Sequence, residues 1–242
     1  MTRFKQATLA VAVGTCGVHG LAQGFVNVYE IPHNVSINVI ANQRYHENIN
    51  KTLHHWDNQP LKDRYKRPGS LPLAQSNGQG IAVMTQGLPR EQAAAGGAAY
   101  RQALGFHEQV IRKFGLPSGD LGVALASSIA GAWMAYNNQP FPDQYFVPLV
   151  TQMRERLASS AALQSLSDGD RTTTYESLAV TGMMLASSQI TWQRNPRAPG
   201  ADALRERMRT QGGETLTRML QVPPDQVAIG PQGLISQASA TR

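Results

Sequence analysis

The sequence predicts a mainly all-α protein, a compact antiparallel bundle of about five helices followed by a short C-terminal strand or hairpin. From Pro89 onward, apolar residues recur at the spacing typical of one helical face. Clusters of proline, glycine and asparagine interrupt this pattern at intervals, as expected between helices. Residues 227–235 alternate apolar with turn-forming positions, which favours a strand or hairpin. Short connections between the segments predict antiparallel neighbours.

The first predicted helix follows Pro89 and ends at Phe114. Tyr100 and Leu104 lie on its apolar face, and Gly115 with a proline two residues later ends it. We expect Ser118 to cap the second helix, which runs to about residue 136 before an Asn-Asn-Gln-Pro stop.

The third predicted helix follows Pro142-Asp143 or begins near Pro148, since proline fits best in a first turn. The fourth begins after Ser167, with Asp170 three residues later as in a capping box. A fifth covers residues 201–220 and is weakened by two adjacent glycines.

Small residues are concentrated on the second and fourth predicted helices, around Gly131 and Gly182. Small side chains allow two helix backbones to approach closely. We therefore expect these helices to be central and packed against each other, with a small-residue channel for a ligand as the alternative.

Residues 1–22 have the pattern of a secretory signal, with basic Arg3 and Lys5, an apolar stretch over 7–18 and a small-x-small site at Gly20-Leu21-Ala22. We expect cleavage near Ala22 and a periplasmic or secreted protein. The apolar stretch is too short to span a membrane. Lipid attachment at Cys16, the only cysteine, is the alternative.

Four regions follow from this pattern. After the signal at 1–22, residues 23–88 are rich in Asn, Gln, Gly and Pro, which predicts a flexible lead-in. The helical domain covers 89–235, and 236–242 form a disordered tail. The chain carries 22 basic and 16 acidic residues, so removing Arg3 and Lys5 leaves 20 minus 16, a net charge of +4. This small excess does not predict a nucleic-acid partner.

The candidate chemistry is sparse. A cluster of imidazole and carboxylate side chains could ligate a metal: His46-Glu47, His54-His55 and Asp57, with His33 upstream. The position four residues after His46 is Asn50, however, so the zincin pattern is broken. His107 lies on an apolar stripe, where a histidine is usually a satisfied core group. We therefore predict no catalytic, cofactor-binding or metal-binding residue and no cofactor.

Several carboxylates could serve a hydrolase, which needs two of them about 5–9.5 Å apart in a cleft. The capping positions of Asp143, Asp168 and Asp170 favour structural roles, and Glu176 is expected to be exposed. The remaining candidate is Glu155.

Aromatic residues surround the turn between the second and third predicted helices: Trp133, Tyr136, Phe141, Tyr145 and Phe146. Such a cluster packs a core or, where exposed, makes a binding hot spot. The sequence thus favours a non-enzymatic module that binds a partner protein or envelope component, with a carboxylate-dependent hydrolase of envelope polymers as the alternative. Its oligomeric state is left open.

The stretch from Ser128 to Tyr136, the segments at 139–143 and 148–154, and the later Tyr175 to Met184 resemble a family of exported bacterial proteins known only as a domain of unknown function. The resemblance covers about residues 95–235. It implies a signal peptide, an Asn/Gln-rich lead-in and a helical domain, and no assigned activity.

Overall fold

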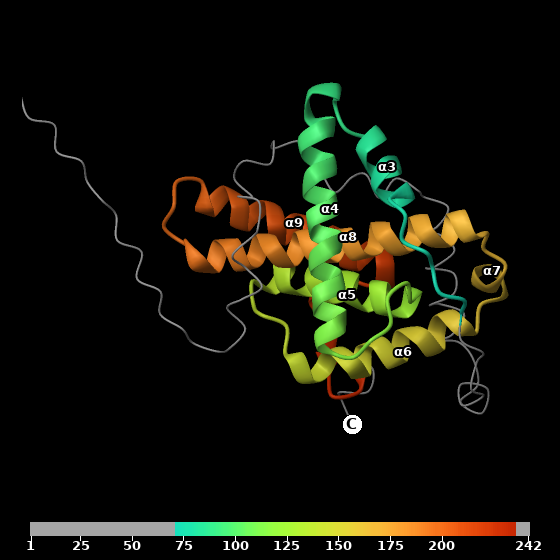
Figure 1. Ribbon diagram of the computed structural model, residues 1–242. Coiled ribbons are helices and arrows are strands. Elements are labelled where there is room, and N and C mark those ends of the chain that lie inside the picture. Colours follow the sequence, from blue (N-terminus) through green and yellow to red (C-terminus); the bar gives the residue numbers. More distant parts are fainter. Residues whose placement is uncertain (1–70, 236–242) are drawn as a thin grey trace, which may run out of the picture.

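A computed structural model describes residues 71–235, which form a mainly helical domain (Figure 1). The longer helices are α4 (Arg90–Lys113), α5 (Leu121–Asn137), α6 (Phe146–Ala158), α8 (Asp168–Arg194) and α9 (Ala201–Leu220). Shorter elements are α3 (Gln79–Gln86), the 3-10 turns η3 (Asp143–Tyr145) and η4 (Pro224–Gln226), and α7 (Ala161–Gln164). Strands β1 (Ala228–Gly230) and β2 (Gly233–Ile235) follow. None of these described helices is long and apolar enough to cross a membrane.

Helices α5 and α8 form the centre of the fold, packed against each other through glycine. A Cβ added at Gly131 would lie 2.0 Å from the carbonyl oxygen of Gly182, and one added at Gly182 would lie 2.4 Å from the carbonyl oxygen of Ser127. The two backbones are therefore in direct contact, with no space for any side chain between them. The expected close packing of these helices is confirmed.

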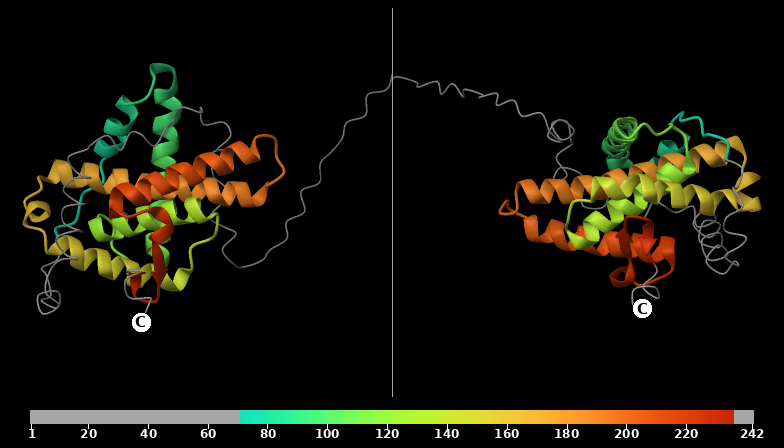
Figure 2. Two further views of the ribbon diagram at one scale, coloured as in Figure 1. Left: turned by 180° about the vertical axis from the view of Figure 1, so that it is seen from behind. Right: turned by 90° about the horizontal axis from the view of Figure 1, so that it is seen from below.

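The same principle brings α6 and α9 onto α5. A Cβ at Gly212 of α9 would lie 2.6 Å from the carbonyl oxygen of Ala132, and one at Gly122 of α5 would lie 2.9 Å from the amide nitrogen of Arg154. Seen from below in Figure 2, α3 and α4 lie on one side of the α5–α8 pair and α9 on the other. Enclosed in this way, α5 is buried continuously from Leu121 to Ala132.

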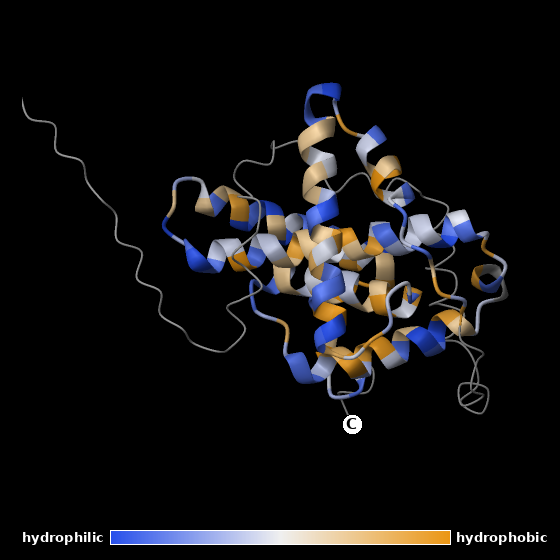
Figure 3. Ribbon diagram, viewed as in Figure 1, coloured by the Kyte–Doolittle hydropathy of each residue, from blue (hydrophilic) through white to orange (hydrophobic). Residues whose placement is uncertain are grey.

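The distribution of hydrophobic and hydrophilic residues agrees with this arrangement of the helices. Figure 3 shows hydrophobic residues gathered where α4, α5 and α8 cross, and hydrophilic ones at the exposed α3–α4 and α8–α9 turns. The buried residues of α8 include polar ones, because the helix is covered on several sides over most of its length. These polar groups need partners inside the protein.

The residues predicted for the first turn or the cap of a helix are correct for α8 and α6 and wrong for α5. Ser167 caps α8 by accepting the amide of Asp170, as predicted. Pro148 lies in the first turn of α6, also as predicted. The cap of α5, however, is Asp120, whose carboxylate accepts the amide of Val123. Ser118 instead donates to Glu108 across the turn.

The ordered domain begins earlier than the sequence predicted. Residues 71–88 were assigned to a flexible lead-in, but they contain α3, whose Ile81 and Met84 are buried. Ala74 also donates its amide to the carbonyl of Gly119 at 2.8 Å. The segment is short and polar, and its helix depends on packing against α8 and α4, so its own periodicity is weak. Residues 1–70 and 236–242, with the predicted signal, lead-in and tail, lie outside the described residues.

The C-terminal hairpin is confirmed, with Ile229 opposite Leu234 in an antiparallel pair. Gln152 of α6 extends its hydrogen bonding, because its side-chain oxygen accepts the Leu234 amide at 2.7 Å and its side-chain nitrogen donates to the Leu234 carbonyl at 3.1 Å. The hairpin is thereby attached to α6 on the underside of the molecule (Figure 2).

Candidate functional site

A largely apolar cavity of about 440 Å³ lies between α4, α5, α8 and the η3–α6 corner. We call it the aromatic cavity. Small residues of α5 and α8, Ala130 and Ala186, form part of its wall, and Phe106, Phe114, Phe141 and Phe146 form much of the rest. Ligand sites in proteins typically have volumes of about 300–1,000 Å³ and a mainly apolar lining with a few polar groups.

Two residues of the aromatic corner predicted from the sequence, Phe141 and Phe146, line this cavity. The ring centres of Phe114 and Phe146 are 5.0 Å apart, and Phe141 contacts Phe146 at 6.4 Å and Trp133 at 5.8 Å in edge-to-face geometry. Such ring pairs hold each other in place beyond the effect of area burial alone. The corner is thus core packing on one side and cavity wall on the other.

Charged groups lie at the edge of the aromatic cavity. Lys113 donates to the carboxylate of Asp143 at 2.7 Å, joining the end of α4 to η3, and both side chains are substantially exposed. Lys113 and Arg194 are in the last turns of α4 and α8, where a cation complements the helix dipole. Asp143 is in the first turn of η3. The ends of the helices thus account for the positions of these charged groups.

Beside the cavity, hydrogen-bonded polar side chains form a chain that we call the His107 relay: Ser127, His107, Tyr175 and Glu108. His107 is fully buried, with its Nε2 atom 3.1 Å from the Ser127 hydroxyl and its Nδ1 atom 3.4 Å from the Tyr175 hydroxyl. Tyr175 donates to Glu108 at 2.6 Å, and Ser118 donates to the same carboxylate oxygen at 2.9 Å. Ser127 also lines the aromatic cavity. The prediction of a satisfied core histidine is confirmed for the ring itself.

Burial makes His107 neutral at ordinary pH. Desolvation lowers the pKa of His107 from 6.5 to about 4, although the neighbouring Glu108 carboxylate acts in the opposite direction. Desolvation, followed by its hydrogen bond to Glu108, raises the pKa of Tyr175 well above its usual range, so this hydroxyl keeps its proton. A neutral imidazole donates from one nitrogen and accepts at the other.

Glu176 is the largest departure from the sequence prediction, because it is completely buried instead of exposed. Its Oε1 atom accepts from the Ser76 hydroxyl at 2.7 Å and from the amides of Asn77 and Gly78. Its Oε2 atom accepts the amides of Gly80 and Ile81 at 2.7 and 3.3 Å. Glu176 therefore satisfies the first turn of α3 from a distant helix, and both of its oxygens are occupied by the protein itself.

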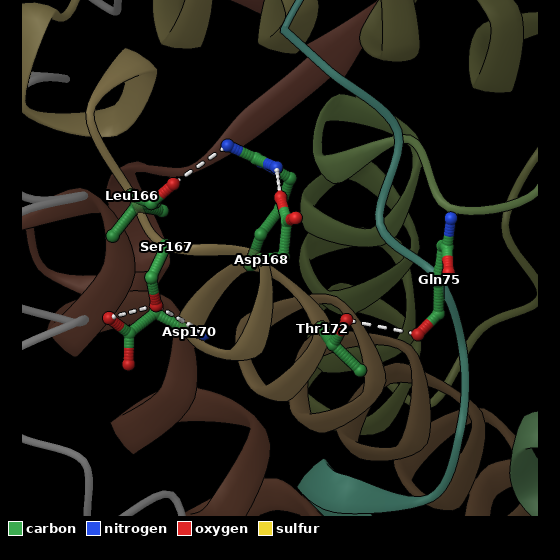
Figure 4. A network of polar contacts seen from close by, with 7 residues as sticks. Gln75, Leu166, Ser167, Asp168, Asp170 and Thr172 are labelled. Atoms are coloured by element: carbon green, nitrogen blue, oxygen red, sulfur yellow. Dashed lines mark hydrogen bonds and ion pairs between the residues drawn. The ribbon is translucent and has the colours of Figure 1, made fainter.

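The acidic residues at the start of α8, Asp168 and Asp170, make contacts that stabilise the fold. Figure 4 shows Asp170 paired with the Ser167 cap. Asp168, whose side chain is fully exposed, pairs with the guanidinium of Arg171 at 2.6 Å. Figure 4 also shows Thr172 donating to the Gln75 carbonyl, which fastens the segment before α3 to α8. These contacts confirm structural roles for the acidic residues at the start of α8.

A second cavity, of about 470 Å³, is lined by Asp120, Arg154 and Glu155 beside Leu71 and Leu157. It brings Glu155 together with Asp120, which the sequence did not single out. Asp120 accepts from the Val123 amide with one oxygen and from the Arg154 guanidinium, at 2.8 Å, with the other. Both oxygens of Asp120 are thus engaged in holding α5 to α6.

No group of three potential metal ligands occurs within residues 71–235. The candidate metal ligands predicted from the sequence lie outside the described residues: His33, His46, Glu47, His54, His55 and Asp57.

Comparison with known proteins places the chain in one family: residues 73–237 match DUF6683, a family of unknown function, and the chain belongs to it. The match begins close to the ordered segment before α3, earlier than the resemblance read from the sequence. No curated protein matches the chain. No solved structure matches it either.

Proposed function

We propose that this protein is a non-enzymatic binding module whose aromatic cavity takes an apolar group of a small molecule or envelope component. The observation that carries the proposal is the cavity itself, a space of about 440 Å³ with four phenylalanines in its lining. Apolar surface removed from water on binding contributes about 25 cal/mol per Å², and a walled cavity offers contact on several sides.

Binding suits the geometry better than nucleophilic catalysis at Ser127. This serine lies in the middle of α5, where the surrounding amides are used in helical hydrogen bonds and none is directed at an oxyanion. Its partner His107 has a pKa lowered to about 4 by burial, which disfavours acceptance of a proton at neutral pH. The His107 relay therefore serves better as a fixed polar contact than as a base.

The test uses diphenylhexatriene, an apolar dye that fluoresces when shielded from water. Ala186 lines the cavity and is buried, so Ala186→Phe fills the space and is expected to lower dye affinity at least tenfold. Ala94→Phe is the matched control, because Ala94 is exposed on α4 and does not line the cavity. Equal binding by wild-type protein and both variants would place the dye elsewhere and refute the proposal.

The alternative, a hydrolase of envelope polymers, would have to use the second cavity, where Glu155 and Asp120 come together. Asp120 is already bound to Arg154 and to the α5 amide, which leaves one uncommitted carboxylate candidate. Release of reducing ends from cell-wall glycans that is lost in Glu155→Gln would favour this alternative over the binding module.

We also propose that the chain is exported and cleaved between Ala22 and Gln23. The basic head, short apolar stretch and small-x-small site support this proposal. Intact-mass measurement of the protein recovered from an expressing bacterium tests it. A mass that includes residue 1, or one with a lipid on Cys16, would contradict cleavage at Ala22.

A further inference from the structure

Two buried serines, Ser127 on α5 and Ser187 on α8, are among the residues that line the aromatic cavity. They are 1% and 4% exposed, and both line the cavity. The other polar side chains in the lining, such as Gln193 and Lys113, are exposed at its edge. The hydrogen-bonding character of the interior is therefore set by the direction in which these two serines use their single protons.

The His107 relay fixes the proton of Ser127. Glu108, as a carboxylate, can only accept, so Tyr175 gives it its one hydrogen over 2.6 Å. Toward His107 the Tyr175 oxygen can then only accept, and from this we infer that the imidazole hydrogen is on Nδ1, 3.4 Å away. In that tautomer the Nε2 atom has a lone pair, so the Ser127 hydroxyl, 3.1 Å away, is the donor. Only the lone pairs of Ser127 remain for a ligand.

The hydroxyl hydrogen of Ser187 is also used in a hydrogen bond within the protein. Its hydroxyl donates to the carbonyl of Met183 one turn earlier in α8, at 2.5 Å. A serine bonded to its own helix in this way has no second hydrogen to offer. Both buried hydroxyls of the cavity therefore present lone pairs, although a serine in isolation can act as donor or acceptor.

We propose that the aromatic cavity selects an apolar, ring-bearing ligand that carries a neutral hydrogen-bond donor, a hydroxyl or N–H group, and rejects ligands whose polar group can only accept. The inference rests on the proposed function and names its ligand class. A ligand carbonyl or carboxylate placed against Ser127 and Ser187 would bring two hydrogen-bond acceptors together. Neither acceptor would then have a donor, although both have been removed from water. The four phenylalanine rings of the lining favour an aromatic body.

The experiment compares three ligands of one ring system by calorimetry on the wild-type protein: 1-naphthol, 1-methoxynaphthalene and 1-naphthoate. The naphthol is expected to bind about tenfold more tightly than the methoxy compound, since one buried hydrogen bond has about that value. The naphthoate, which only accepts, is expected to bind more weakly than either. Equal affinity of the naphthol and its methyl ether, or tighter binding of the naphthoate, would overturn the inference.

The double variant Ser127→Cys/Ser187→Ala tests whether the two serines cause the preference for a ligand with a hydrogen-bond donor. Cysteine keeps His107 covered, while sulfur is a weak acceptor. The naphthol-to-ether ratio is expected to fall to about one, with the affinity for the ether little changed and the melting temperature recorded as a check of folding. A tenfold ratio that persists in a folded variant would contradict the assignment.

The outcomes separate this inference from the proposed function. If the ether and the naphthol bind equally and Ala186→Phe abolishes both, the cavity binds apolar rings and only the donor preference is wrong. If none of the three ligands binds to the wild-type protein, the proposed function and this inference both fail.

Discussion

Small residues have opposite consequences in two neighbouring regions of this molecule. At the α5–α8 crossing, Gly131 and Gly182 bring two backbones into contact, with no room for a single added carbon. Next to Gly131 and one turn after Gly182, Ala130 and Ala186 line the aromatic cavity, whose other walls are formed by α4 and the η3–α6 corner. A small side chain thus creates close contact where two helices face each other and open space where the covering element lies farther away.

The largest expected effect tests the crossing. Gly131→Leu and Gly182→Leu should each destabilise the domain by 3 kcal/mol or more, about the upper end of overpacking costs, because the obstructing atoms are backbone and cannot rotate away. At about 2–4 °C per kcal/mol, thermal unfolding should show a fall of about 6 °C or more, or no folded protein.

Gly105→Ala supplies the control for that experiment. Gly105 is exposed on α4, with nothing within 4 Å of an added Cβ, so alanine should raise stability by up to about 1 kcal/mol through helix propensity. A rise in melting temperature for the Gly131 or Gly182 variants as well would show that the crossing is looser than the structure has it.

An effect of intermediate size is expected in the pH dependence of stability, through the buried His107. Because the folded-state pKa of His107 is lowered from 6.5 to about 4, the unfolded chain takes up a proton at this site before the folded one does. The stabilising contribution is therefore complete above about pH 6.5 and is lost as the pH falls towards 4. Between pH 7 and pH 5 the loss attributable to His107 should be about 2 kcal/mol.

Urea unfolding at both pH values, in wild-type protein and His107→Gln, measures this loss as a difference. Carboxylates titrate in both proteins, so the smaller pH dependence expected in the variant isolates the histidine. An identical pH dependence in the two proteins would show that His107 is more accessible to water than the buried His107 relay implies.

The smallest effect tests the open region. Ala186→Leu adds apolar volume toward the aromatic cavity, so it should change the free energy of unfolding by less than about 1 kcal/mol in either direction. Thermal unfolding beside the Gly182→Leu variant gives the comparison on one helix. A loss as large as that of Gly182→Leu would mean that no usable space exists at Ala186, and it would remove the basis for ligand binding.

The sequence predicted the helices well because their signals are local. The positions of Ser167, Pro148 and the glycine-rich faces lie within a few residues of the structures they specify, and the packing of α5 on α8 follows from composition alone. The aromatic corner was also visible in the sequence, since its residues are close together along the chain.

Other features were invisible because their partners are remote in sequence. The position of Glu176 beside an apolar face suggested exposure. Its partners, however, are the Ser76 hydroxyl, 100 residues earlier, and amides 95 to 99 residues earlier, in a segment with little helical pattern of its own. His107 could be assigned to the core, but its contact with Ser127 on the next helix could not be derived from periodicity. One available signal was the run of polar residues on a helix that packing predicts to be central, since buried polar groups need partners.

The sequence by itself determined the five longer helices, which two of them are central, and that a hairpin follows them. The tertiary structure alone decided where empty space lies and how the buried protons are directed. Helical periodicity and capping are short-range effects, which act between residues within about one turn of each other. A cavity and a hydrogen-bond relay depend on the distances among α4, α5, α8 and η3, and no single helix encodes those distances.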